Sequence, residues 1–380
     1  MMKPSKTEKK SLTRQKICLI YNFAQHYRYN IFKLLDENFQ IDFVFGDKMD
    51  DVKKMDYSVL KNFIKEVKNE TIIGPLYFQK GVISLIKGNY SFFIVLGDIH
   101  CLSTWILLIL AKIYKKKVLL WTHGWYGKEK FYIKSLKKIF LGMAYKILLY
   151  GDYAKNLMIQ EGFKTSKLAV IYNSLNYNQN IELRKKLKKS SIYIEHFKNP
   201  NPNLVFIGRL TAIKRLDLLF KAIYLLKKKS KHYNLTLIGS GAKESELKSL
   251  ANDLNIKGGL WFYGSCYEEE KISELIYNAD LCISPGNVGL TAIHSLSYGT
   301  PVITHDNFAE QMPEFEAIVD GVTGLFFEQN NVRSLAGQIE NWCSKMNKNR
   351  EQVRIDCYEI IDSKYNPYVQ LDVIKSIINS

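Results

Sequence analysis

Short apolar segments alternate with helical segments along almost the whole chain, and this pattern runs through twice. The apolar segments are rich in β-branched and aromatic residues, as buried strands are, and segments such as FYIKSLKKIFLGMAY (131–145) between them have helical spacing. Strands that alternate with helices form a parallel sheet covered on both faces. The predicted strands lie at 16–23, 41–46, 91–97, 117–123, 145–151 and 167–173, and then at 203–210, 235–241, 259–265, 281–286 and 300–306.

The two runs are separated by a polar, lysine-rich stretch at 183–203. Because 380 residues exceed one compact core of ordinary size, we predict an α/β protein with two doubly wound, Rossmann-like domains that face a central cleft. The domains are expected at 1–190 and 203–364, with a linker at 191–202 and the last helix, 365–380, packing back on the first domain. Ligands of such sheets bind outside the carboxyl ends of the strands, which places the site in the cleft.

Positive charge is concentrated in the first half of the chain. Residues 1–200 contain 35 Lys and Arg against 16 Asp and Glu, a net charge of +19, whereas residues 201–380 contain 19 against 21, a net charge of −2. A basic half indicates nucleic acid, anionic lipid headgroups or a lipid-linked phosphate as partner, and the alternative is a lysine-rich composition general to the source. No zinc-finger, RNP-like or helix-turn-helix signature is present, so we expect no nucleic-acid partner.

No apolar run approaches the roughly 18–20 residues that span a bilayer, and the longest, 104–111, stops at a lysine. The basic N-terminus, 1–16, leads into the short apolar run 17–23 without a small-residue cleavage site, so we expect no signal peptide. We therefore predict a cytoplasmic protein, peripheral on the inner face of the cell membrane. Its basic helices at 107–117 and 134–146 are expected to contact the anionic membrane surface.

Two turns of the second half are suited to a diphosphate. The first predicted strand there ends at Gly208-Arg209, and Lys214 follows just before a helix. Arginine offers phosphate a forked contact and lysine a point charge. The next strand ends in a turn from Gly239 to Gly241, whose backbone can approach a ligand closely.

A third turn lies in the segment SPGNVGLTAIH (284–294). Gly286 and Gly289 allow the backbone to turn tightly, and the N–H groups of Gly289, Leu290 and Thr291 begin a predicted helix. The positive end of a helix favours phosphate. Because all three turns follow strands of one parallel sheet, we expect them to converge on one edge.

Several segments of the second half resemble one enzyme family. GRLTAIKRLD, LIGSGAKESELKSLA, NADLCISPG, GLTAIHSLSYGTPVI and DGVTGLFF occur in the order and spacing of retaining glycosyltransferases of the GT-B fold, the glycogen-synthase-like group called family four. The resemblance covers 203–346, and AQHYRYNIF (24–32) and WTHGWYG (121–127) match more loosely. It implies that the second domain holds a nucleotide-sugar, that the first receives the acceptor, and that Arg209 and Lys214 bind the diphosphate.

The turns and the resemblance together predict the donor-binding residues. These are Gly208, Arg209, Lys214, Gly239, Gly241, Tyr263, Gly286, Asn287, Gly289, Leu290, Thr291 and His294. The chain departs from the family at two of them, because the family has glutamates, which meet the donor sugar and the ribose, where Gly286 and His294 stand. His294 either bonds a ribose hydroxyl or is a packed helix histidine. Gly286 cannot replace a carboxylate, so sugar recognition differs or another residue supplies it.

Four residues of the first half are predicted on the acceptor side of the cleft: His26, Arg28, Asp98 and His123. The resemblance places His123, which ends a predicted strand, near the transferred sugar, and the alternative is a structural histidine. Arg28 either holds an acceptor phosphate or caps local structure. Glu314, in QMPEFEAI, resembles a segment that follows the glycine turn in the family, and its role is open.

Catalysis is assigned to His123, Arg209 and Lys214. The resemblance implies that a donor phosphate oxygen helps to deprotonate the acceptor, while cations and helix amides stabilise the leaving diphosphate. The sequence has no Asp-x-Asp pair, no P-loop and no closely spaced cysteine pair, so we expect no metal and no cofactor.

The sequence thus predicts a metal-independent hexosyl- or related glycosyltransferase. It would transfer a sugar, with retention, from a nucleotide-sugar to a glycan or to a polyprenyl- or other lipid-linked acceptor. The resemblance implies bacterial-type cell-surface polysaccharide biosynthesis, of lipopolysaccharide, O-antigen or capsule. Two alternatives remain: a nucleotide-sugar epimerase of the GT-B fold, and a non-catalytic nucleotide-sugar-binding partner, which the loss of both glutamates favours.

Overall fold

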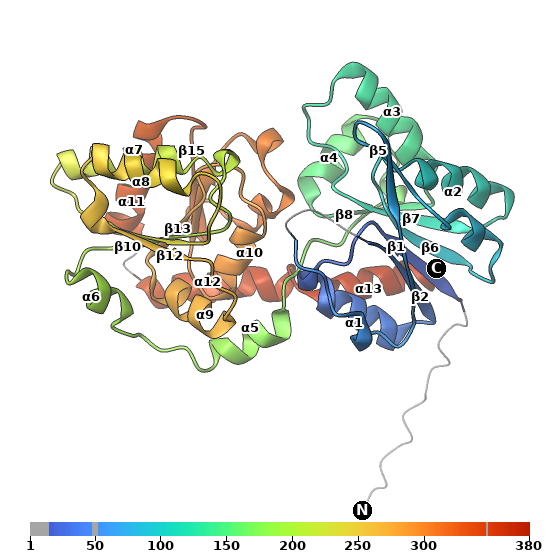
Figure 1. Ribbon diagram of the computed structural model, residues 1–380, viewed down its shortest axis with the longest axis horizontal. Helices are drawn as coiled ribbons and strands as arrows, with labels where there is room; N and C mark the ends of the chain where they lie inside the picture. Colours follow the sequence, from blue (N-terminus) through green and yellow to red (C-terminus); the bar gives the residue numbers. More distant parts are fainter. Residues whose placement is uncertain (1–14, 48–51, 347–348) are drawn as a thin grey trace, which may run out of the picture.

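The computed structural model describes residues 15–47, 52–346 and 349–380. Two α/β domains lie side by side along the long axis of the molecule (Figure 1). The first domain has a seven-stranded parallel sheet in the order β3-β2-β1-β6-β7-β8-β9. Its strands are β1 (Ile17–Tyr21), β2 (Ile41–Gly46), β3 (Phe63–Val67), β6 (Phe92–Leu96), β7 (Lys117–Thr122), β8 (Lys146–Leu149) and β9 (Leu168–Val170).

Both faces of this sheet are buried. In β1, Ile17, Leu19 and Tyr21 belong to one apolar cluster and Cys18 and Ile20 to another, because successive side chains of a strand point to opposite faces. The domain also contains the helices α1 (Tyr29–Asn38), α2 (Leu102–Ile113), α3 (Phe131–Gly142) and α4 (Asp152–Gln160), and an antiparallel hairpin of β4 (Asn69–Ile73) and β5 (Leu76–Gln79).

The second domain has a six-stranded parallel sheet in the order β12-β11-β10-β13-β14-β15. Its strands are β10 (Asn203–Ile207), β11 (Asn234–Ile238), β12 (Leu260–Gly264), β13 (Leu281–Ile283), β14 (Val302–His305) and β15 (Gly324–Phe327). Its helices are α7 (Leu216–Lys228), α8 (Glu244–Asp253), α9 (Glu269–Asn278), α10 (Leu290–Ser297) and α11 (Val332–Asn341), and a π-helix covers Trp342–Met346.

Short 3-10 helices occupy several of the loops. They are η1 (His26–Arg28), η2 (Tyr57–Val59), η3 (Ile83–Lys87), η4 (Thr165–Lys167), η5 (Ala212–Lys214), η6 (Lys257–Gly259), η7 (Phe308–Glu310) and η8 (Pro313–Ala317).

In each sheet the strand order reverses once, between β1 and β6 in the first domain and between β10 and β13 in the second. Ligands of doubly wound sheets bind at such points, outside the carboxyl ends of the strands. The loop after β1 carries Arg28, the loop after β6 carries Asp98, and the loop after β10 carries Arg209 and Lys214. These four residues therefore follow strands at which the order reverses.

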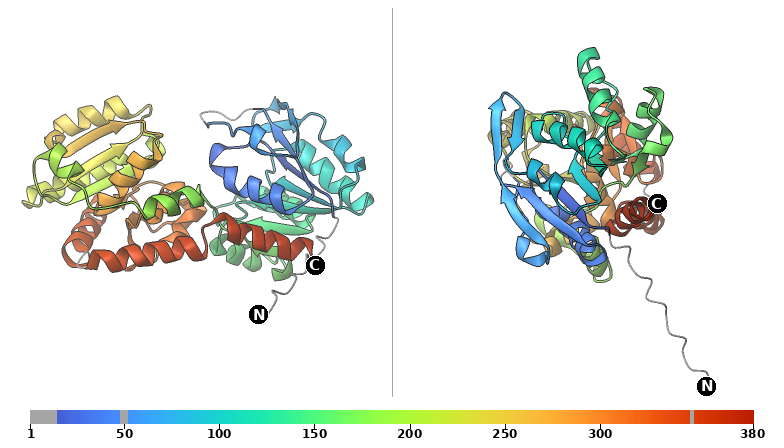
Figure 2. Two further views of the ribbon diagram at one scale, coloured as in Figure 1. Left: turned by 90° about the horizontal axis from the view of Figure 1, so that it is seen from below. Right: turned by 90° about the vertical axis from the view of Figure 1, so that its right-hand side faces the viewer.

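Two helical segments connect the domains. The first contains α5 (Tyr177–Arg184) and α6 (Ile192–Phe197), and the second contains α12 (Arg350–Ser363) and α13 (Pro367–Ile378). The left view of Figure 2 shows the red helices α12 and α13 running beneath the two domains in succession. α12 packs against α10 and α13 packs against α1. Pro367 and the Asn366 side chain, which accepts bonds from two N–H groups of the first turn, begin α13 anew after α12 ends.

The stretch predicted as a linker, 191–202, packs on the second domain instead. It contains α6, in which Tyr193 is buried and donates a hydrogen bond to the Leu275 carbonyl oxygen at 2.6 Å. The His196 ring stacks on Trp261 with 3.8 Å between ring centroids. Aromatic side chains within this polar stretch thus find partners on the second domain, and the predicted bounds of the domains and the linker stay a prediction.

Four strands escaped the sequence prediction: β3, β4, β5 and β15. In β3 and β4 most side chains are exposed or half-buried and several are charged, so no apolar run marks these strands. β15 is buried but only four residues long. Short strands of this kind are set by their neighbours in the sheet rather than by a local pattern.

Within the described ranges, no helix combines the length and the apolar content needed to cross a bilayer. Residues 1–14, which form most of the N-terminal stretch on which the expectation about a signal peptide depends, lie outside the described residues.

Candidate functional site

The loops after β10 and β11 pack backbone against backbone. A Cβ atom at Gly239 would lie 2.0 Å from the Gly208 carbonyl oxygen, and Gly239 has a φ of +138°, which side chains rarely adopt. The Gly208 N–H donates to the Ile238 carbonyl oxygen at 3.0 Å. Glycine at these positions therefore keeps the two loops close together at the carboxyl edge of the sheet.

Lys214 ties the loop after β10 to the loop after β13. Its Nζ donates to the Asn287 carbonyl oxygen at 2.7 Å and to Asn287 Oδ1 at 3.0 Å. Burial and the neighbouring positive charge of Arg209 lower the pKa of Lys214 to about 8, although the carboxylate of Glu314 opposes the shift. Two cations thus lie together where a doubly wound sheet binds its ligand.

Gly286 packs against the same lysine segment. Its N–H donates to the Lys214 carbonyl oxygen at 3.1 Å, and a Cβ atom there would lie 1.9 Å from the Ile213 carbonyl oxygen. No side chain fits at this position without movement of the backbone. The packing therefore leaves no room for a carboxylate at position 286, and the Gly286 N–H is bonded to the segment that carries Lys214.

Side-chain hydrogen bonds fix the position of the first turn of α10. The Val288 N–H donates to Gln311 Oε1 at 2.7 Å, and Gln311 Nε2 donates to the Thr304 hydroxyl and to the His305 carbonyl oxygen, each at 2.9 Å. The Thr291 hydroxyl donates to the Ile207 carbonyl oxygen at 2.9 Å. The first N–H groups of a helix have no acceptor within the helix. Within the part of the chain that the structure describes, the N–H groups of Gly289 to Thr291 have no acceptor, so they are donors for an anion.

His294, also on α10, is paired with a carboxylate from another element. Its Nε2 lies 2.7 Å from Glu269 Oε1 at the start of α9, and the Tyr298 hydroxyl donates to the same oxygen at 2.5 Å. His294 and Tyr298 together lower the pKa of Glu269, against the effect of burial. A carboxylate from α9 thus lies beside position 294.

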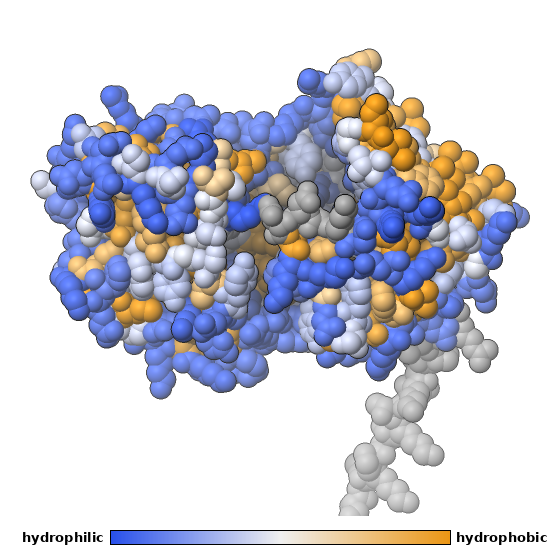
Figure 3. All heavy atoms as spheres, viewed as in Figure 1, coloured by the Kyte–Doolittle hydropathy of each residue, from blue (hydrophilic) through white to orange (hydrophobic). Residues whose placement is uncertain are grey.

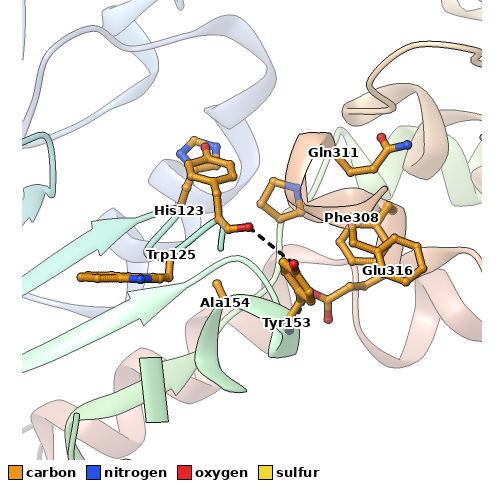
Figure 4. A pocket seen from close by; sticks show the side chains of 10 residues that line it. His123, Trp125, Tyr153, Ala154, Phe308, Gln311 and Glu316 are labelled. Atoms are coloured by element: carbon orange, nitrogen blue, oxygen red, sulfur yellow. Dashed lines mark hydrogen bonds between the residues drawn. The ribbon is translucent and has the colours of Figure 1, made fainter. Parts of the chain in front are cut away.

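His123 lines a pocket between the domains. Figure 4 shows His123 and Trp125 of the first domain on one side and Phe308, Gln311 and Glu316 of the second on the other. Burial, and then the charges of Arg28 and Lys137, lower the pKa of His123 to about 4. The imidazole is therefore neutral at physiological pH and can both donate and accept a hydrogen bond.

Arg28 lies inside an aromatic box. Its guanidinium carbon is 5.0 Å from the ring centroids of Tyr21 and Trp121 and 5.5 Å from that of Tyr150, and only 6% of the residue is exposed. Its Nη2 donates to the Tyr150 hydroxyl, and among the described residues Nε and Nη1 have no hydrogen-bond partner. In this position Arg28 supports the loop after β1, and its role toward an acceptor stays a prediction.

Glu314 bridges the two domains. It is 3% exposed, and its Oε1 accepts a hydrogen bond from Asn173 Nδ2 of the first domain at 2.7 Å. Its Oε2 has no partner among the described residues. Burial raises the pKa of Glu314, while the bond from Asn173 and the charges of Arg28 and Lys214 oppose the rise. A carboxylate oxygen is thus available between the cations of the two domains.

Three other predicted residues, His26, Asp98 and Tyr263, contact other parts of the protein. His26 is exposed and its Nδ1 lies 3.3 Å from the Lys53 carbonyl oxygen. Asp98 accepts hydrogen bonds from the Tyr77 hydroxyl at 3.1 Å and from the His100 N–H at 3.0 Å. Tyr263, at the end of β12, packs edge-on against Trp261. No contact joins these three to Lys214, Glu314 or His123 in the described part of the chain, so their assignment stays a prediction.

Comparison with known proteins finds a family match for the second domain. Residues 188–355 match the family described as glycosyl transferases group 1. This part of the chain is thus similar to group 1 glycosyltransferases. Among curated proteins, an uncharacterized glycosyltransferase of Haemophilus influenzae is 28% identical over 198 residues, which are 50% of this chain and 49% of that relative. The match therefore spans about half of each protein.

Solved structures extend the likeness beyond the group 1 domain. Anabaena HepE, solved in complex with UDP, has a TM-score of 0.70 at 15% identity and covers 96% of this chain and 100% of its own. The lipopolysaccharide outer core galactosyltransferase WaaB, in its apo form, has a TM-score of 0.70 at 16% identity and covers 96% and 99%. The predicted GT-B fold is thereby confirmed. The narrower assignment to family four stays a prediction.

Proposed function

We propose that this protein is a glycosyltransferase that takes a sugar from a nucleotide-sugar and transfers it to a glycan or lipid-linked acceptor. The observation that carries the proposal is the convergence of Arg209, Lys214 and the first turn of α10 at the strand-order reversal of a group 1 domain. Two cations and free N–H groups suit a diphosphate. HepE, one of the structural neighbours, was solved with UDP and with UDP-glucose.

In the proposed reaction the second domain binds the leaving diphosphate. Lys214 and Arg209 neutralise the charge that develops as the bond to the sugar breaks, and the N–H groups of Gly289 to Thr291 add fixed donors. Groups positioned before the reaction stabilise developing charge most effectively, because they need no reorganisation. The lysine is held in place by Asn287, so its orientation is set before the donor binds.

The first domain contributes a neutral imidazole at the opposite side of the cleft. His123 is proposed to bond a hydroxyl of the transferred sugar or of the acceptor, which a neutral ring can do in either direction. The acceptor oxygen is proposed to bond to the anomeric carbon on the face from which the diphosphate departs, so configuration is retained. As the bond between the sugar and the diphosphate breaks, a phosphate oxygen of the leaving diphosphate takes the acceptor proton. Metal independence is part of the same proposal, because the two cations supply the charge that a metal would.

The two carboxylates missing from the family pattern bear on the alternative of a non-catalytic binding partner. Gly286 leaves no room for a side chain, which supports that alternative. Glu314 and Glu269, however, supply carboxylates beside Lys214 and beside His294. We propose that Glu314 meets the hydroxyls of the transferred sugar and that Glu269, with His294, meets those of the nucleoside.

We further propose that the protein works in bacterial-type cell-surface polysaccharide biosynthesis, as a peripheral protein on the inner face of the cell membrane. The excess of positive charge in the first 200 residues supports an anionic surface as partner. One structural neighbour, WaaB, is a lipopolysaccharide outer core galactosyltransferase, which is in keeping with this proposal.

The test is turnover of a panel of UDP- and GDP-sugars and other nucleotide-sugars, by transfer and by hydrolysis, in the presence of a chelator. We expect one donor to be consumed by the wild type and not by Lys214→Ala. Lys243→Ala is the matched control, because Lys243 is half-buried like Lys214 and, among the described residues, its ammonium group pairs with Glu246 alone. Nucleotide binding without turnover of any donor, with lipid-linked acceptors supplied, would favour the non-catalytic partner.

A further inference from the structure

Apolar side chains are exposed together on α2 and α3 of the first domain. On α2 they are Ile106, Ile109 and Ile113, spaced by three and four residues along one face. On α3 they are Phe131, Tyr132, Leu136 and Ile139. We call these seven residues the α2–α3 face. Figure 3 shows their surroundings as the orange area over α3 and α2.

The exposure is large for side chains of this kind. Phe131 is 84% exposed, Ile113 68% and Ile139 62%. The two helices are joined beneath the surface, where Trp105 of α2 and Phe140 of α3 lie 4.8 Å apart between ring centroids. The seven residues therefore lie on adjacent helices. Contiguous apolar surface on a globular protein marks a binding surface.

Positive charge surrounds the α2–α3 face. Residues 101–150 contain ten lysines and a single acidic residue, Glu129. Glu129 is already bound by Lys137, at 2.6 Å. Lys112, Lys130 and Lys138 form no ion pair or hydrogen bond through their side chains among the described residues. The surface is thus apolar at its centre and cationic at its rim.

The charge distinguishes between two possible occupants. A second copy of the chain would bring the same lysines against these lysines, and the two rims would repel. An anionic bilayer attracts the rim, while its interfacial region accepts isoleucine, tyrosine and phenylalanine side chains. The combination of an apolar centre and a cationic rim therefore fits a lipid surface better than a second copy.

The α2–α3 face adjoins the cleft. α3 begins after the loop that carries His123, and Lys137 of α3 donates to the Gly124 carbonyl oxygen at 2.6 Å. The same lysine bonds Glu129, whose carboxylate accepts from the Tyr126 N–H at 2.8 Å. α3 and the His123 loop are thus fixed to each other, and a bilayer on α3 would lie beside the first-domain wall of the pocket.

We propose that the α2–α3 face inserts into the interface of an anionic bilayer and that it thereby presents the His123 side of the cleft to an acceptor held in that bilayer. The second half of this statement rests on the proposed glycosyltransferase function, whereas the docking itself does not. Some lysines of this region are bound within the protein. Lys134 pairs with Glu161 at 2.5 Å and Lys137 is held inside the fold, so the contacts come from Lys112, Lys130 and Lys138.

The test is flotation of the full chain with vesicles of phosphatidylcholine alone and of phosphatidylcholine with an equal amount of phosphatidylglycerol. We expect binding to the mixed vesicles only. A triple variant, Tyr132→Ser with Leu136→Ser and Ile139→Ser, removes apolar contacts with the bilayer. Charge attraction alone then holds this variant on the vesicles, so its remaining binding should be lost when salt is added. Changing Lys112, Lys130 and Lys138 to Gln should lower partitioning on the order of a hundredfold and leave little dependence on salt.

The matched control changes equally exposed apolar residues outside this face, Ile194, Ile355 and Val322, to Ser. It should bind vesicles as the wild type does. Circular dichroism and nucleoside diphosphate binding show that each variant is folded. Unchanged vesicle binding in both triple variants would overturn the proposal. So would sedimentation as a dimer that only the apolar variant dissociates, since the face would then serve self-association. Because no donor is present, failure here leaves the donor-turnover test of the proposed function unaffected.

Discussion

The second-domain wall of the cleft is built from backbone and cations, whereas the first-domain wall is built from aromatic rings. In the second domain, Gly239 and Gly286 let three loops close on one another, and Lys214 projects between them. In the first, Arg28 is enclosed by Tyr21, Trp121 and Tyr150. In the second-domain wall the charge of Lys214 can meet a ligand, whereas in the first-domain wall the charge of Arg28 holds the loop after β1 in place.

Substitutions in the two walls should therefore affect different properties of the protein. A change in the second-domain wall removes a group that a ligand would meet, so it should alter kinetics or binding more than stability. A change in the aromatic box removes a contact within the fold, so it should alter stability more than donor recognition. The predictions that follow test this division.

The largest effect is expected for Lys214→Ala. Losing one preorganised stabiliser of developing charge costs on the order of 10²–10³-fold in kcat, about 3–4 kcal/mol in the barrier. The free energy of unfolding should change little, because the lysine is only half-buried. Steady-state kinetics with the donor identified in the panel measure it. A loss no greater than that of the Lys243→Ala control would contradict the assignment.

Gly286→Ala should be the most destabilising of the small changes. The new Cβ atom would start 1.9 Å from the Ile213 carbonyl oxygen, so the backbone that carries Lys214 must move. We expect a loss of about 3 kcal/mol in the free energy of unfolding, at the upper end of overpacking costs. Urea titration measures it. Gly337→Ala on α11 is the control, since its Cβ meets nothing within 4 Å and alanine favours a helix. Equal stability of the two variants would be inconsistent with the close contact at Gly286.

Tyr150→Phe tests the first-domain wall. The Tyr150 hydroxyl accepts from Arg28 Nη2 and lies 3.1 Å from the Tyr21 hydroxyl, so its removal leaves a buried cation with fewer partners. We expect about 2 kcal/mol of destabilisation and an unchanged KM for the donor. Tyr145→Phe, which deletes a hydroxyl without a hydrogen bond among the described residues, is the control. A large rise in KM with unchanged stability would place the box in the donor site instead.

Glu314→Gln should mainly change the pH dependence of kcat/KM. The Gln side chain can still accept the bond from Asn173, so the fold should persist. Glu314 raises the pKa of Lys214, and without its charge the lysine loses its proton at lower pH. We expect kcat/KM to fall roughly tenfold and its alkaline limb to move to lower pH. Glu310→Gln, at an exposed salt bridge with Lys128, should leave the limb in place.

Most strands of the fold could be predicted from local sequence patterns. The strands β1, β2, β10 and β14 are apolar runs that the sequence marks, and the residues that follow β1 and β10 were predicted to face the cleft. The hairpin of β4 and β5 was missed because it is largely exposed and carries no apolar alternation of the expected kind. Its position depends on tertiary neighbours, which a local pattern does not contain.

The site was predicted less completely, for a related reason. Lys214 follows a strand end, where the sequence indicates a ligand. Glu269, however, meets His294 across 25 residues of sequence, and Glu314 meets Asn173 across 141. Contacts of this kind leave no spacing to recognise. The one available signal was negative, since the missing carboxylate at position 286 indicated either that sugar recognition differs or that another residue supplies the group.

Lys214 and the first turn of α10 are proposed to bind a nucleoside diphosphate. The most direct test is calorimetric titration of UDP and GDP into the wild type and into Lys214→Arg, from about pH 6 to about pH 10. Burial and Arg209 set the pKa of Lys214 at about 8, so the lysine is charged below that pH and neutral above it. We predict that the wild-type affinity for one of the two nucleotides is constant up to about pH 8 and then declines by up to tenfold per pH unit. The affinity of Lys214→Arg for the same nucleotide should not change over this pH range, because arginine stays charged. Failure of both nucleotides to bind at any pH, or identical profiles for the two proteins, would contradict the claim.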